Sequence, residues 1–213
     1  MIKAIIFDLD GTLLDTSEGV VECARYAAER LGQPRLPREE LLDFIGPPLT
    51  DSFPKHYGFD EETTREAIRL FRQHYQEGAV YKARPYQGIF TLCDALHVRG
   101  TFMAVATNKL EPMAQKLLAH FGFDRYCSPI RGADPDGRLK KADLIRLCLE
   151  ELGIRPEESV LMGDTVFDAE GAAAAGVGFL AVTYGFGFRT RSDAEPYATA
   201  GIISTPAEAL EVL

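Results

Sequence analysis

Residues Lys3 to Thr12 read K-A-I-I-F-D-L-D-G-T, a short apolar run that ends abruptly in two acids and a glycine. Such a run predicts a strand that is buried on both faces, as strands of parallel sheets are. Further apolar runs, separated by segments of helical periodicity, lie at residues 101–107, 160–162, 178–183 and, more weakly, 202–203. Strands that alternate with helices need crossover connections. The pattern therefore predicts an α/β protein with a mainly parallel sheet and helices on both faces.

The alternation of strands and helices is interrupted after the first strand. From Ser17 to about Val80 the sequence favours helices alone, at residues 17–31, 38–45, 49–57 and 60–76. Ser17 is suited to cap the first helix and Gly32 to end it. We therefore predict a core domain of residues 1–15 and 82–213 and an inserted domain of four helices over residues 16–81. The joints near residues 15 and 82 would act as a hinge.

Composition limits the possible classes of function. Of 213 residues, 46% are hydrophobic, and the formal net charge of -9 argues against a general affinity for nucleic acid or anionic membranes. No segment approaches the roughly 20 apolar residues of a membrane-spanning helix, and the first residues lack the regions of a signal peptide. We therefore expect a cytoplasmic protein. The cysteines and histidines show no metal-ligand spacing, which makes a zinc site improbable.

Asp8 and Asp10 stand at the end of the first predicted strand. Residues i and i+2 leave a strand on the same side, so both carboxylates can face one point beyond the sheet. One acid can then act as a nucleophile while the other exchanges a proton, which suits phosphoryl transfer to a carboxylate. D-x-D-G could also begin a calcium loop, but Gly19 stands where that loop requires a glutamate ligand.

Three other motifs carry polar side chains at the ends of predicted elements. Asp164 and Asp168 would join Asp8 in an oxygen-rich site suited to a hard ion such as Mg²⁺, although an acid at a helix N-terminus is the simpler alternative. Thr107 and Asn108 can offer donors to an anion or merely cap a helix. The run R-L-K-K at residues 138–141 precedes a helix, where cations are disfavoured unless an anion compensates.

Taken in order, D-L-D-G-T, T-N, a lysine ahead of a helix and G-D-x-x-x-D resemble the four motifs of the haloacid dehalogenase-like hydrolases. The resemblance spans residues 8–168, and the whole chain is similar to the phosphoglycolate phosphatase-like branch. It implies a Rossmann-like parallel-sheet core with an inserted four-helix cap domain. It also implies a Mg²⁺-dependent phosphatase that hydrolyses a small phosphomonoester through an aspartyl phosphate. The expected partner is a small phosphorylated metabolite, such as phosphoglycolate, a nucleotide or a sugar phosphate.

The resemblance assigns a role to each motif residue. The nucleophile would be Asp8 and the general acid and base Asp10, which would also offer its backbone carbonyl to the metal. A lysine would neutralise the nucleophile and the phosphate together. The expected site consists of catalytic Asp8, Asp10 and Lys141; substrate-binding Thr107, Asn108, Gly46 and Pro47; and metal-binding Asp8, Asp10, Asp164 and Asp168.

The sequence leaves Lys140 and Lys141 in competition for the lysine motif. Many relatives carry K-P-x-P, whereas this chain reads K-K-A-D. We choose Lys141 because other relatives show a single lysine two places before an acidic residue, here Asp143.

The same motifs are also compatible with other functions. A dehalogenase would not need the acid at Asp10, but a phosphomutase or a pyrophosphatase would keep the same core. A signalling receiver domain, which belongs to another class, also phosphorylates an aspartate. Its acidic pair normally precedes the phosphoacceptor on a separate strand, and it has no helical insertion. The chain could be a monomer or a homodimer.

Overall fold

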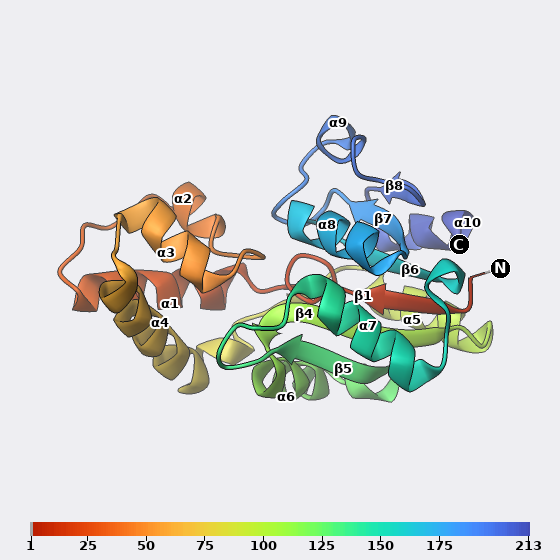
Figure 1. Cartoon of the computed structure of the whole chain (residues 1–213), viewed down its shortest axis with the longest axis horizontal. Helices are drawn as coiled ribbons and strands as arrows, with labels where there is room; N and C mark the ends of the chain where they lie inside the picture. Colours follow the sequence, from red (N-terminus) through yellow and green to blue (C-terminus); the bar gives the residue numbers. More distant parts are fainter. Residues whose placement is uncertain (1) are drawn as a thin grey trace. The chain divides into compact units, whose positions relative to one another are not determined.

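The structure is a computed structural model that describes residues 2–213 (Figure 1). It divides into two compact units. Unit 1 comprises the described residues up to Leu14 together with Pro85–Leu213, and unit 2 comprises Asp15–Arg84.

Unit 1 is built on a six-stranded parallel sheet in the order β5-β4-β1-β6-β7-β8. Its strands are β1 Ala4–Phe7, β4 Phe102–Leu110, β5 Cys127–Ala133, β6 Ser159–Gly163, β7 Gly178–Val182 and β8 Gly201–Ile203. All of β1 is buried, which explains its uninterrupted apolar run. Phe7 pairs with Val105 of β4 and with Met162 of β6, so the residues that follow these three strands meet at one edge of the sheet.

Helices cover the sheet of unit 1. They are α5 Ile89–Val98, α6 Glu111–Phe121, α7 Lys141–Leu152, α8 Val166–Ala175, α9 Arg191–Ala194 and α10 Ala209–Val212, with short 3-10 turns at Phe123–Arg125, Pro156–Glu158 and Pro206–Glu208. α7 and α8 pack together in a core that includes Ile6, Ala104 and Leu161 of the sheet. α6 contacts β4 and β5, and α5 contacts β4 and α10. The predicted α/β fold with a Rossmann-like parallel sheet is confirmed.

Unit 2 contains four α-helices among its residues 15–84: α1 Ser17–Arg30, α2 Arg38–Leu42, α3 Leu49–Tyr57 and α4 Glu61–Gln76, followed by the 3-10 turn Ala79–Tyr81. The predicted four helices are therefore present, although α2 ends three residues earlier than expected. α4 buries Ala67, Ile68, Phe71 and Tyr75 at helical spacing. Two short strands, β2 Leu14–Asp15 and β3 Arg84–Pro85, pair where the chain passes between the units. That unit 2 acts as a cap stays a prediction.

The strand β5, Cys127–Ala133, is absent from the sequence-based prediction. Its residues read C-S-P-I-R-G-A, in which Pro129 and Arg131 interrupt the apolar run. The strand lies at the edge of the sheet and pairs with β4 alone. An edge strand tolerates proline and charge because one side needs no backbone partner, so it lacks the pattern of a buried strand.

No helix within residues 2–213 has both the length and the apolar character needed to cross a membrane. The four cysteines are free and buried.

Candidate active site

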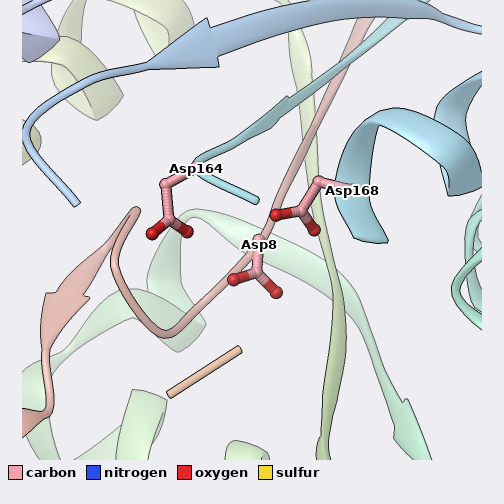
Figure 2. A group of neighbouring side chains, drawn as sticks. All are labelled: Asp8, Asp164 and Asp168. Atoms are coloured by element: carbon pink, nitrogen blue, oxygen red, sulfur yellow. The ribbon is translucent and has the colours of Figure 1, made fainter. Parts of the chain in front are cut away.

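Three acidic side chains gather where β1 and β6 end (Figure 2). Asp8 directly follows β1, and its backbone N–H donates to Met162 O of β6 at 2.9 Å. Asp164 directly follows β6, and Asp168 lies in the first turn of α8. One carboxylate oxygen from each acid lies within 4.8 Å of the other two, and all three residues are at most 4% exposed.

Lys141 supplies a cation to this cluster. Its Nζ lies 2.6 Å from Asp8 Oδ1 and 2.8 Å from Asp168 Oδ1, and it donates to Ala106 O at 3.0 Å. A Cβ on Gly171 of α8 would lie 2.4 Å from Lys141 Cγ, so glycine there leaves room for the lysine stem. Lys140 is exposed, and the structure therefore brings Lys141, not Lys140, to the expected nucleophile.

The N-terminus of α8 orients Asp168. Thr165, the N-cap residue, donates to Asp168 Oδ2 from its backbone N–H at 3.0 Å and from its hydroxyl at 2.7 Å. The Thr165 hydroxyl in turn accepts the Asp168 backbone N–H at 3.3 Å, which completes a capping box. Asp168 is thus both a helix-capping acid and a member of the charged cluster.

A loop after β7 holds Asp164. Asp164 Oδ2 accepts the backbone N–H groups of Phe186 at 2.7 Å and Gly187 at 3.1 Å. Among residues 2–213, Asp164 Oδ1 has no hydrogen-bond partner, although the residue is fully buried. A buried acceptor without a partner costs free energy, so this oxygen is suited to a cation.

The charges and pKa values of the cluster also favour a bound cation. Burial raises the pKa of Asp8 to about 7, against the lowering effect of Lys141, and burial also raises the pKa of Asp164 well above its usual range. Burial alone would lower the pKa of Lys141, but Asp168 and Asp8 raise it above its ordinary value. When ionised, three carboxylates and one ammonium leave two negative charges, which a divalent cation would balance. The all-oxygen donors fit a hard ion.

Asp10 lies in the turn after β1 and is 7% exposed. Its carboxylate is not a member of the three-acid cluster. That its backbone carbonyl binds the metal stays a prediction. The Nζ of Lys109 lies 2.9 Å from Asp10 Oδ1. Thr107 is buried near the carboxyl end of β4. Its hydroxyl accepts the Lys109 backbone N–H at 3.2 Å, and Asn108 beside it is half-buried.

The other two expected site residues, Gly46 and Pro47, lie in unit 2 between α2 and α3. Gly46 has a φ of 100°, a backbone conformation that favours glycine. Their contact with a substrate stays a prediction.

Several groups in this region are missing from the sequence-based prediction. They are Lys109, Thr165 and the backbone N–H groups of Phe186 and Gly187. Lys109 directly follows the T-N motif, and the Y-G-F-G-F run at residues 184–188 follows a predicted strand. Their places at the carboxyl ends of strands are a signal that could have found them.

The family model for haloacid dehalogenase-like hydrolases matches residues 5–182. The chain belongs to this family. The resemblance inferred from the four motifs is therefore confirmed, and with it the prediction that the chain is a hydrolase.

Named relatives cover most of this hydrolase. A 5'-nucleotidase of Pseudomonas aeruginosa is 41% identical over 186 residues, which are 86% of this chain and 83% of that protein. A phosphoglycolate phosphatase of Aquifex aeolicus is 30% identical over 185 residues, which are 86% of each chain. The tyrosine-protein kinase PtkA of Mycobacterium tuberculosis is 36% identical over 87% of this chain, which spans only 63% of PtkA. A predicted phosphatase from Clostridium acetobutylicum superposes with a TM-score of 0.92 at 31% identity, with 99% of both chains covered.

Proposed function

We propose that this haloacid dehalogenase-like hydrolase is a Mg²⁺-dependent phosphatase that cleaves a small phosphomonoester through an aspartyl phosphate on Asp8. The observation that carries the proposal is the buried cluster in which Lys141 Nζ lies 2.6 Å from Asp8 Oδ1 beside two further acids. The similarity to a 5'-nucleotidase and to a phosphoglycolate phosphatase supports a phosphate ester as the substrate.

In the first step, a carboxylate oxygen of Asp8 attacks phosphorus and the bond from phosphorus to the leaving oxygen breaks. Asp10 gives its proton to that oxygen, so that an alcohol leaves. Lys141 offsets the negative charge that would repel the phosphate from Asp8. Mg²⁺ held by the cluster acids would offset the charge of the phosphate and nucleophile further.

In the second step, Asp10 accepts a proton from a water molecule whose oxygen attacks phosphorus. The bond from phosphorus to Asp8 breaks, which restores the carboxylate and releases inorganic phosphate. Thr107 and Asn108, which lie in the last residues of β4, would bind the phosphate oxygens in both steps.

Substrate selection is proposed to lie in unit 2. The segment Gly46-Pro47-Pro48 joins α2 to α3, and two successive prolines stiffen it enough to hold a fixed shape against a ligand. Substitution at Pro47 should then change the order of preference among natural phosphate esters and leave p-nitrophenyl phosphate turnover within about a few fold. An equal loss toward every substrate in a folded variant would contradict this role.

The first experiment is hydrolysis of p-nitrophenyl phosphate with Mg²⁺ and with excess chelator, for the wild type and for Asp8→Asn. The wild type should need the metal, and Asp8→Asn should lose almost all turnover while it keeps its fold. Acid quenching during turnover should trap a phosphoryl group that hydroxylamine releases, as expected of an acyl phosphate. More than trace activity in Asp8→Asn would refute the covalent mechanism, and full activity in chelator would refute the metal requirement.

A further inference from the structure

The carboxyl end of β4 contains a bulge. Thr107 pairs with Gly132 of β5, and Leu110 pairs with Ala133, so three steps along β4 (107 to 110) oppose one step along β5 (132 to 133). Asn108 and Lys109 are therefore two extra residues that the register of β5 does not match. Bulges next to active sites re-aim side chains, and Lys109 is one of the two residues that this bulge adds.

Neighbouring residues fix the shape of this bulge. A Cβ on Gly132 would lie 2.6 Å from Lys109 O and 2.5 Å from Glu111 Cα, so only glycine lets β5 approach the bulge this closely. Glu111 Oε2 accepts the Gly132 backbone N–H at 3.1 Å, and the Thr107 hydroxyl accepts the Lys109 backbone N–H. The backbone that carries Lys109 is thus held by contacts on both sides.

The Lys109 side chain contacts the acid that handles protons in the proposed reaction. Its Nζ donates to Asp10 Oδ1 at 2.9 Å, and both side chains are 10% exposed. A mostly buried ammonium at this distance restricts the orientation of the carboxylate more strongly than an exposed partner would. Proton transfer depends on that orientation, because the acid must lie within hydrogen-bond reach of the reacting oxygen.

We propose that Lys109 is a positioning residue that holds the Asp10 carboxylate in the orientation needed for proton transfer. The bulge and Gly132 place Lys109 at this position. This assignment rests on the proposed phosphatase function. It differs from direct substrate binding, in which Lys109 would contribute to affinity, and from a purely structural pair, in which its loss would affect every substrate alike.

The test compares an aryl with an alkyl phosphate. Lys109→Met keeps the length of the side chain but removes the charge, and Lys109→Arg keeps the charge. Lys3→Met is the matched control, because it removes an exposed ion pair of similar length, 2.7 Å to Glu158, from the same unit. Gly132→Ala perturbs the bulge but changes neither the Lys109 nor the Asp10 side chain.

An aryl leaving group needs little protonation, whereas an alkoxide needs a well-placed acid. Lys109→Met should therefore lower kcat for the alkyl phosphate about 10- to 100-fold but for p-nitrophenyl phosphate less than about 3-fold, with KM nearly unchanged. Lys109→Arg should recover part of the loss, and Gly132→Ala should show the same selective defect. In an Asp10→Asn background, Lys109→Met should cost nothing further.

Three results would overturn the assignment while the phosphatase function stands. They are an equal loss on both substrates, a rise in KM as the main effect, and a full additional loss in the Asp10→Asn background. A wild type that hydrolyses neither ester with Mg²⁺ would instead refute the phosphatase function and this assignment together.

Discussion

Replacement of Lys141 by Met would test the charge balance of the site most directly. The substitution removes the ammonium that lies 2.6 Å from Asp8 and 2.8 Å from Asp168 and leaves both carboxylates buried. Loss of one partner from a buried ion pair costs about 3–5 kcal/mol of unfolding free energy, because the remaining charge stays desolvated. Lys140→Met makes the same chemical change at the exposed neighbouring position and should cost less than about 0.5 kcal/mol.

The pH dependence separates lost charge from lost packing. With Lys141 present, the pKa of Asp8 is raised from 3.8 to about 7, and removal of the ammonium that lowers it should raise it further. A carboxyl whose pKa is higher in the folded state destabilises the fold when it is ionised, and this penalty disappears as it binds a proton at lower pH. The deficit of Lys141→Met should therefore be large near pH 8 and shrink toward about pH 5.5.

Urea unfolding in excess chelator at both pH values measures this deficit, and p-nitrophenyl phosphate turnover with Mg²⁺ measures the catalytic loss. We expect Lys141→Met to be inactive and Lys140→Met to match the wild type. A Lys141→Met variant within about 1 kcal/mol of the wild type near pH 8 would show that these carboxylates do not carry the cost of unpaired buried charges. A deficit that is equal at both pH values would mean that packing, not charge, was lost.

Three further outcomes follow from the site. Asp10→Asn should lower alkyl phosphate turnover by about two to four orders of magnitude and aryl turnover less, in steady-state assays. Gly185→Ala would put a Cβ 2.4 Å from Asp164 Oδ2, so half-maximal activity should need about 10- to 100-fold more Mg²⁺. Because raised pKa values make protons compete with metal at Asp8 and Asp164, Mg²⁺ should raise the melting temperature more near pH 8 than near about pH 5.5; an equal rise at both would contradict this competition.

The parts of the fold and site that the sequence predicts are those with a local pattern. The run before Asp8 and the run before Asp164 are continuous and apolar because β1 and β6 are buried at the centre of the sheet. The carboxyl ends of neighbouring parallel strands lie side by side at one edge of the sheet, so the acids that follow them are expected to lie close together. The structure brings Asp8, Asp164 and Asp168 together, while their chemical roles remain predictions.

What the sequence did not reveal depends on contacts between distant residues. The pair Lys109 and Asp10 joins residues 99 positions apart, and it needs a bulge that no local pattern announces. The structure adds burial to the spacing that favours Lys141 over Lys140, because Lys141 is buried and its Nζ donates to Asp8 Oδ1, whereas Lys140 is exposed. Neighbouring lysines have the same propensities and charge, so composition could not separate them.

Glycines explain how so many charges fit into so small a space. A Cβ on Gly11, Gly163 or Gly185 would lie 2.3–2.5 Å from an atom of Asp164 or Asp168, closer than side-chain contacts allow. Of these three, only Gly11 has a positive φ, so at Gly163 and Gly185 it is the missing side chain that matters and not an unusual backbone. A Cβ on Gly163 would first meet atoms of Asp168, whereas one on Gly185 would meet Asp164 and also the backbone O of Gly11, at 2.5 Å. The requirement for glycine at Gly163, and part of the requirement at Gly11 and Gly185, therefore comes from the geometry of the charged site, which needs acids held close enough to share one cation.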